Sequence, residues 1–362
     1  MKDDIDRLLT RTPLLKAREI AKELGLVRKE VNSFLHSHQD LYKKDAEFRW
    51  RLIEGAELRL TLPAGWVTGA EFEAILHAEG PVLNGPFQQV KIVFSPKCKT
   101  MIDCTARVLA LANQLVIKGK GVTMDFESAG QTKAYLNRAG FFDHLDESVT
   151  VLPSRPAESA ADRYRGKSST LVEFGAVHPH SANDDLIEQL TNRFVQQSTD
   201  DYQMAAFTVF SELIGNVMEH SQTPLRGFAG LQKYSGNKNH KDHIQTVVSD
   251  SGVGIASTLR PALRAHYPSL YERFGQRSLE SDIGIVTAAM SEGGVSRFGG
   301  ARGLGFKSSR EQATKFNAKF SVRQERFYLT FVYKKGQLVE VQRQTKVIKL
   351  NGTHICFDFY LD

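Results

Sequence analysis

Three short segments in the second half of the chain constrain its fold more than any other feature, because they combine a polar-faced helix with two glycine-rich turns in a fixed order. The first segment, Ser211 to Ser221, reads SELIGNVMEHS. The second, Asp250 to Ile255, reads DSGVGI, and the third, Gly299 to Phe306, reads GGARGLGF. Together the three segments predict a nucleotide site.

The first segment is predicted to be a helix with a buried face, since apolar residues recur at helical spacing from Ala205 to Val217. Glu212 and Asn216 are one turn apart and share a face of this helix. An amide oxygen beside a carboxylate suits Mg²⁺, and the carboxylate can orient or deprotonate an attacking hydroxyl or water. The polar edge of an ordinary helix is the alternative interpretation.

The second and third segments supply turns. Asp250 follows the end of a predicted strand, 244–248, and its carboxylate offers an acceptor for an exocyclic amine. The glycines after Asp250 let the backbone pass close to a flat base. The third segment precedes a predicted helix, 308–316, and backbone amides of a glycine-rich turn at a helix N-terminus bind phosphate. A glycine pair alone indicates only a turn, so the prediction depends on the order of the segments.

In this order the segments resemble the GHKL superfamily, the ATP-binding fold shared by histidine kinases, gyrase B, Hsp90, MutL and the anti-sigma-factor kinases. ELIGNVMEH resembles the N box of that family, DSGVG its first glycine box and GGARGLG its second. The resemblance covers residues 169–362. It implies a GHKL (Bergerat) α/β sandwich with ATP and Mg²⁺ as cofactors.

The resemblance also assigns roles to residues. It implies that Asn216 coordinates Mg²⁺, that Glu212 is the general base, and that Asp250 bonds the adenine amino group. Thr353, in the predicted terminal strand 351–360, matches the threonine that closes the adenine side. The glycines assigned to ATP are Gly252 and Gly254 at the base, and Gly303 and Gly305 at the phosphates.

Three more polar residues near these motifs have two interpretations each. His220 resembles the histidine of anti-sigma-type members, and a capping or core histidine fits equally well. Arg302 and Lys307 lie where a cation meets phosphate, and solvated lid charges are the alternative. The interval between the glycine boxes, 256–298, contains a predicted helix from Asp282 to Met290, and the resemblance makes it the mobile lid over ATP.

Composition limits the class of protein. A chain of 362 residues allows two or three domains. The formal charge of +6 permits a nucleic-acid partner without demanding one. The three cysteines, Cys98, Cys104 and Cys356, form no CxxC pair, which indicates a reducing cytoplasm and no structural zinc. The charged start of the chain is unlike a secretory signal, and no stretch is predicted to span a membrane, so a cytoplasmic protein is expected.

Residues 1–56 are predicted to form a winged helix-turn-helix: three short helices and a hairpin, with Gly25 turning the chain. The polar face of the third helix carries groups that suit phosphates and base edges, namely Arg28, Lys29, Asn32, Ser33 and His36. A nucleic acid duplex is therefore an expected partner. A winged helix used for protein contacts is the alternative.

The same segment resembles more narrowly the Z-alpha family, which binds left-handed duplexes. Arg28 and Asn32 match that family's phosphate-binding Lys and Asn, and Trp50 matches its wing tryptophan. His36 stands where the family has a tyrosine, and the wing prolines are missing. These departures favour ordinary duplex binding over Z-form recognition.

Residues 57–152 alternate strand and helix signals, which predicts an α/β layer. VKIVF, MIDCTARVLALANQL, GVTMDF and AYLNRAGFFDHL resemble the STAS domain of anti-sigma-factor antagonists. That resemblance implies a protein partner and places Thr105 at the residue that a GHKL kinase phosphorylates. Cys104 and Ala106 depart from the family's IDSSG turn, and a plain helix N-cap is the alternative role for Thr105.

The fold class is thus α/β (α+β): a winged helix at 1–56, a STAS-like domain at 57–152, a linker at 153–168 and a GHKL domain at 169–362. A histidine kinase is rejected, since the linker has neither histidine nor heptads. Three functions remain: an ATP-driven regulatory switch, a Ser/Thr protein kinase of the anti-sigma type, and a non-catalytic adaptor. A homodimer is an expectation from the resemblance only.

Overall fold

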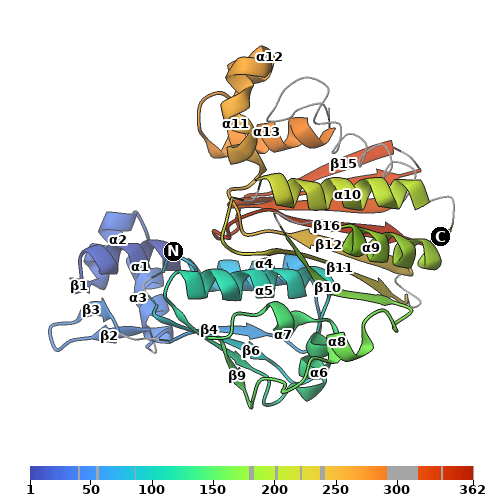
Figure 1. The fold of residues 1–362 in the computed structure, drawn as a ribbon. Helices are drawn as coiled ribbons and strands as arrows, with labels where there is room; N and C mark the ends of the chain where they lie inside the picture. Colours follow the sequence, from blue (N-terminus) through green and yellow to red (C-terminus); the bar gives the residue numbers. More distant parts are fainter. Residues whose placement is uncertain are drawn as a thin grey trace.

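The computed structural model arranges the chain as three units of mixed α/β structure (Figure 1). Their α/β character agrees with the class predicted from the sequence. Within the described part of the chain, none of the helices combines the length and apolar character that crossing a bilayer requires. The described residues are 1–39, 41–53, 57–85, 87–178, 183–199, 203–220, 222–236, 241–291, 317–335 and 337–361.

The N-terminal unit contains the three helices and the hairpin that its apolar spacing predicts. The helices are α1 (Lys2–Arg11), α2 (Ala17–Leu24) and α3 (Arg28–Ser37), and Gly25 ends α2 in a left-handed conformation with φ 65°. A small antiparallel sheet, in the order β1-β3-β2, closes the unit. Its strands are β1 (Leu15–Lys16), β2 (Tyr42–Lys44) and β3 (Arg49–Leu52).

The middle unit is built on a parallel sheet in the order β4-β6-β8-β9. Parallel strands need crossover connections, which the helices provide. The sheet strands are β4 (Glu57–Leu62), β6 (Gln89–Phe94), β8 (Gly121–Asp125) and β9 (Thr150–Leu152), and the crossover helices are α4 (Gly69–Glu79), α5 (Ile102–Ile117), α6 (Gly130–Arg138) and α7 (Phe141–His144). Two short parallel strands, β5 (Gly65–Val67) and β7 (Cys98–Thr100), precede α4 and α5.

The structure corrects the predicted linker at 153–168. This interval contains α8 (Ala160–Tyr164), and Ala161 within it is completely buried. The Arg155 guanidinium donates to backbone carbonyls of the preceding turn, among them Leu145 O at 3.1 Å. Asn137 on α6 donates to Glu158 O at 3.1 Å. The Pro- and Ser-rich composition indicated a free connection, but these contacts hold the interval against the middle unit.

The C-terminal unit is a seven-stranded antiparallel sheet in the order β10-β11-β12-β16-β13-β14-β15. Neighbouring strands pair antiparallel throughout. The strands are β10 (Leu171–Val177), β11 (Gly227–Tyr234), β12 (His243–Ser249), β13 (Ala318–Gln324), β14 (Phe327–Lys334), β15 (Gln337–Gln344) and β16 (His354–Tyr360). The predicted strands 244–248 and 351–360 correspond to β12 and β16, so Thr353 lies just before its strand.

Helices α9 (Asp184–Gln197) and α10 (Gln203–His220) cover one face of this sheet (Figure 1). Beyond the end of β12, the interval predicted as a lid forms α11 (Ile255–His266), α12 (Pro268–Phe274) and α13 (Leu279–Ser291). The sequence predicted only the last of these three helices. The helix predicted at 308–316 lies outside the described residues.

The opposite face of the C-terminal sheet packs on the middle unit, so that α4 and α5 lie between the two sheets (Figure 1). Helix α5 is buried on nearly all sides, its polar Asp103, Arg107 and Gln114 included, as expected of a helix covered on both sides. A single apolar cluster joins its side chains to Phe174, Phe228 and Val247 of the C-terminal sheet. The middle and C-terminal units therefore share one core.

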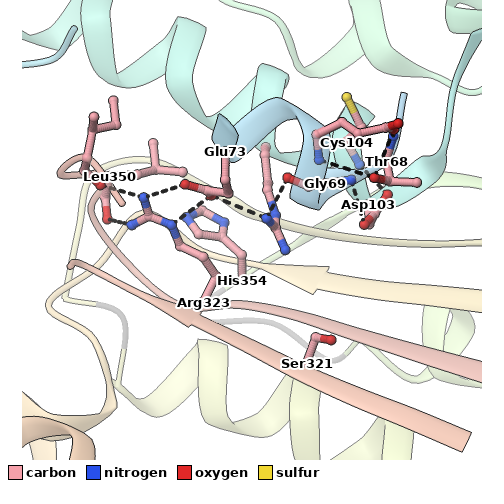
Figure 2. Close-up of polar contacts among 12 residues, drawn as sticks. Thr68, Gly69, Glu73, Asp103, Cys104, Ser321, Arg323, Leu350 and His354 are labelled. Carbon is pink, nitrogen blue, oxygen red and sulfur yellow. Dashed lines mark hydrogen bonds and ion pairs between the residues drawn. The ribbon is translucent and has the colours of Figure 1, made fainter. Parts of the chain in front are cut away.

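Polar contacts at the start of α5 extend this packing (Figure 2). Asp103 accepts hydrogen bonds from the Gly69 N–H at 2.9 Å and the Cys104 N–H at 2.6 Å. Its own N–H donates to Gln245 Oε1 on β12 at 3.2 Å, and the Ile102 N–H donates to the Tyr234 hydroxyl at 2.7 Å. Burial raises the pKa of Asp103, against the opposing charge of nearby Arg107. The first turn of α5 is thus fixed to β11 and β12.

Candidate functional site

The polar face of α10 is as predicted. Glu212 and Asn216 lie one turn apart, and both side chains are half-buried. The Asn216 Nδ2 atom itself is buried and has no hydrogen-bond partner among the described residues. Since a buried polar atom without a partner costs about 1–3 kcal/mol, this amide fits a site that is completed by a ligand.

The same turn of α10 lies beside the end of β12. A Cβ added to Gly227 would lie 2.5 Å from Val217 Cγ1 and 3.1 Å from the Ser249 carbonyl oxygen. Val217 follows Asn216 directly, and Ser249 is the last residue of β12. The structure therefore brings the first two predicted segments together.

Asp250 follows β12 and is only 5% exposed. Its Oδ1 atom accepts the Gly252 N–H at 2.7 Å, and its own N–H donates to Thr353 O at 2.9 Å. Burial raises the pKa of Asp250 to about 6, against the lowering effect of hydrogen bonds from Gly252 and Thr353. At neutral pH the group is therefore a buried carboxylate, which can accept a hydrogen bond from an amine of a bound base.

Thr353 is connected to the first glycine turn through Gln324, the last residue of β13. The Gln324 Nε2 atom donates to Thr353 Oγ1 at 3.1 Å, and its Oε1 atom accepts the Ile255 N–H at 2.8 Å. Gly254 caps α11 with φ 79°, and a Cβ there would lie 2.9 Å from Gln324 Oε1. Sequence reasoning missed Gln324, because it belongs to none of the motifs.

Gly352 lets the loop before β16 approach Asp250 closely. Its φ is 95°, and a Cβ would lie only 2.0 Å from the Asp250 carbonyl oxygen. A side chain at this position would push the two loops apart. A glycine directly before the predicted threonine was the sequence signal for this contact.

The phosphate half of the predicted site is not described. Gly303, Gly305, Arg302 and Lys307 lie outside the described residues, and so does the side chain of His220. Within the described ranges no cluster of three or more His, Cys, Asp or Glu side chains could hold a metal ion.

Thr105, the predicted phosphoacceptor, is buried, with 1% of its surface exposed. Its hydroxyl donates to Met101 O at 3.0 Å and bonds to Thr100 Oγ1 at 2.9 Å. Met101 is the N-cap of α5, so the alternative role of Thr105 as the N-cap is wrong. The hydroxyl has no open path to a second protein in this arrangement.

The residues predicted to meet nucleic acid divide into two groups. An exposed face of α3 carries four of them: Arg28, Lys29, Asn32 and His36. Trp50, in contrast, is 2% exposed and belongs to the core of the N-terminal unit, with the His36 ring edge-on at 5.0 Å. The Trp50 ring is consequently not available for stacking on a base in this structure, because the helices of its own unit cover it.

Comparison with known families bears on the C-terminal unit alone. Residues 201–353 match the model of the histidine kinase-, DNA gyrase B- and HSP90-like ATPase family. Domains of this family bind ATP, usually with Mg²⁺. The match contains Glu212, Asn216, Asp250 and Thr353, whereas the N-terminal and middle units lie outside it. A search of curated proteins found none that matches the chain.

Proposed function

We propose that the protein is an ATP-binding regulatory switch, in which Mg²⁺ and ATP bound by the C-terminal unit control a nucleic-acid-binding winged helix through the STAS-like middle unit. The observation that carries the proposal is the junction of Asp250, Thr353 and the α10 turn with Asn216, inside the segment that matches an ATPase family. The resemblance assigned all three of these residues, Asp250, Thr353 and Asn216, to the site for ATP and Mg²⁺.

In this mechanism the described residues bind and orient the nucleotide. The Asp250 carboxylate accepts a hydrogen bond from the adenine amino group, and Thr353 closes the same side of the base. Bound Mg²⁺ supplies neutralisation of phosphate charge. Asn216 would hold the ion, and Glu212, one turn before it, would orient or deprotonate the attacking water.

The output of the switch is binding of a duplex by the N-terminal unit. The exposed face of α3 carries Arg28 and Lys29, which neutralise phosphates, beside Asn32 and His36, which can reach base edges. Phe48, between β2 and β3, is 66% exposed, and the Lys44 ammonium lies 5.1 Å from its ring. An exposed aromatic ring next to a cation supports the assignment of the N-terminal unit to nucleic acid.

The test is incubation of the full chain with γ-labelled ATP and Mg²⁺, with and without duplex, followed by measurement of free phosphate and of label on the protein. Release of free phosphate at a rate that duplex changes is the expected result. Glu212→Ala should lower the rate of ATP turnover at least about a hundredfold, and the variant should still bind ATP. Tight ATP binding with neither free phosphate nor label on the chain would contradict the switch and leave the adaptor or a kinase whose partner is missing.

A Ser/Thr kinase remains the second candidate, since the same pocket serves phosphoryl transfer to water or to a hydroxyl. The burial of Thr105 favours the switch. Label that appears on the chain and disappears in Thr105→Ala would contradict the switch and identify a kinase acting on its own middle unit. Thr105→Ser, which keeps a hydroxyl, is the control.

A further inference from the structure

Gln114 of the middle unit reaches into the C-terminal unit from the second half of α5. It is 3% exposed. Its Nε2 atom donates to Ser251 Oγ at 2.8 Å and to Asn351 O at 3.0 Å. Its Oε1 atom accepts the Asn351 N–H at 2.9 Å. Both ends of one amide are therefore bonded to the neighbouring unit.

The two segments that Gln114 joins are the loops of the candidate adenine site. Ser251 lies between Asp250 and Gly252 in the first glycine turn, and Asn351 lies two residues before Thr353. The loops also contact each other directly, through the Asp250 N–H to Thr353 O bond. Gln114 thus bridges the two loops from α5, the helix that lies on the face of the C-terminal sheet opposite α10 (Figure 1).

The paired bonds between Gln114 and Asn351 stabilise the contact between the two units, and they also fix the position of the Asn351 backbone relative to α5. The side-chain amide meets both the N–H and the C=O of one backbone residue, so it sets where that residue lies relative to α5. The Asn351 carbonyl also accepts from His354 Nε2 at 3.0 Å, which joins the contact to the start of β16. A shift of α5 along the sheet would break both bonds to Asn351 together.

Resting on the proposed function, we propose that Gln114 is a positioning residue of the ATP site, through which the docking of α5 sets the affinity for adenine nucleotides. It acts through Ser251 and Asn351, which hold Asp250 and Thr353 at the spacing the base requires. The middle unit is then part of the nucleotide site. Displacement of α5 would loosen the two loops and release the nucleotide.

The experiment compares three variants of the full chain. Gln114→Ala removes all three bonds to the loops. Asn113→Ala is the control, since that neighbouring amide makes two hydrogen bonds that both stay inside the middle unit, to His144 O at 2.8 Å and from the Asp146 N–H at 2.9 Å. Gln114→Glu keeps the acceptor for the Asn351 N–H, and it regains a donor for the Asn351 carbonyl only when it is protonated.

The measurement is the Kd for ATP by titration calorimetry, at a temperature where thermal unfolding shows each variant to be folded, together with hydrogen exchange of the loop amides without nucleotide. We expect Gln114→Ala to weaken ATP binding at least about tenfold, as loss of one well-placed hydrogen bond allows, and to speed exchange at 250–252 and 351–353. Asn113→Ala should keep the original Kd. The ratio of Kd values between Gln114→Glu and the unaltered chain should shrink as the pH falls.

The outcomes separate the inference from the proposed function. If the unaltered chain binds no ATP, the proposed function fails and the inference fails with it. If the unaltered chain binds ATP and Gln114→Ala binds it equally well, the inference alone is overturned. Equal weakening by Gln114→Ala and Asn113→Ala would also overturn it, because lost stability would then account for both.

Discussion

Glu73 of the middle unit and Arg323 of the C-terminal unit form a two-point ion pair in which neither side chain is exposed (Figure 2). Arg323 Nε lies 2.9 Å from Glu73 Oε1, and Arg323 Nη2 lies 3.1 Å from Glu73 Oε2. Arg107 Nη1 adds a third contact, at 3.2 Å from Glu73 Oε1. One buried carboxylate therefore meets two buried guanidinium groups where α4, α5 and β13 come together.

The remaining donors of Arg323 go to backbone carbonyl groups, so its charge is satisfied on every side. The carbonyls are those of Gln324, Glu325, Ile348 and Leu350. Taking two charges out of water is costly, and satisfied geometry offsets that cost without a large net gain. Removing one partner of the pair is strongly destabilising, because the charge of the other partner is then left buried without compensation.

Glu73→Gln should lower the free energy of unfolding by about 3–5 kcal/mol, because both Arg107 and Arg323 would keep their charge in a dry interface. Urea unfolding of the full chain measures the change. Glu280→Gln is the control, since Glu280 pairs with Arg343 on the surface at 3.4 Å and should change stability by less than about 1 kcal/mol. Equal losses in the two variants would contradict the structural role given to the buried pair.

ATP affinity should fall as the pH drops through about 6, because the pKa of Asp250 is raised to about 6 and its carboxylate form is a stronger acceptor for the adenine amino group than the neutral acid. Titrations between pH 5 and pH 8 would check this. Asp250→Asn has no carboxylate at any pH. It should bind ATP weakly, and its ATP affinity should lack the change near pH 6 that comes from Asp250. A wild-type affinity that is flat across this window would contradict the assignment of Asp250 to the base.

The same substitution should stabilise the empty protein above pH 6. The folded-state pKa of Asp250 is raised from 3.8 to about 6, so its contribution to stability is fully present below pH 3.8 and is lost as the pH rises through about 6. The loss amounts to at most about 3 kcal/mol. Asp250→Asn avoids it and should unfold at higher urea than the unaltered chain at pH 8, with little difference at pH 4.

The readout for that prediction is the difference between the two proteins at each pH. The pKa of Asp358 is also raised to about 6, mainly by burial. The wild-type curve therefore contains both groups, whereas the difference isolates Asp250. If Asp250→Asn is less stable than the unaltered chain at pH 8, the prediction is wrong. The hydrogen bonds to the Asp250 carboxylate would then outweigh the cost of its burial.

Replacing Arg28 and Lys29 by Glu should weaken duplex binding and reduce its salt dependence. Each lost phosphate contact lowers the slope of log K against log salt by about one, so the double variant should lose about two. Fluorescence anisotropy at several salt concentrations provides the measurement. Arg7→Glu combined with Arg11→Glu, both on α1 outside the α3 face, is the charge-matched control. Duplex binding that responds equally to both variants would point to net charge alone and not to an interface on α3.

The local motifs could be predicted from the sequence because their chemistry lies within one turn or one loop. Glu212 and Asn216 share a face by helical period alone, and Asp250 follows an apolar run that ends in glycines. Both expectations agree with the structure of α10 and β12. The second glycine box, around Gly303, had an equally local signal, and its placement lies outside the described residues.

The contacts between units could not be predicted, because no periodicity relates residues so far apart in the chain. Glu73 and Arg323 are separated by 250 positions, and Gln114 and Asn351 by 237. The sequence signal was indirect: Ile102–Ile117 is rich in apolar residues, which predicts a buried helix without identifying the elements that cover it.

At two positions the residue types suggested a role that differs from the one in the structure. The interval 153–168 has the residues of a loose connection, yet backbone carbonyls near Arg155 accept its guanidinium and fix the chain. Trp50 matches the wing tryptophan of a family that binds nucleic acid, yet it lies in the core of the N-terminal unit. In both cases tertiary contacts decided a role that residue type alone suggested differently.

The single layer formed by α4 and α5 has a consequence for how the protein unfolds and responds. Neither sheet can separate from this layer without exposing apolar helix faces to water, so the middle and C-terminal units should melt in one cooperative transition. Between two separate proteins, such a contact would form and dissociate with concentration. Within one chain its local concentration is constant, and the strength of the coupling is independent of how much protein the cell makes.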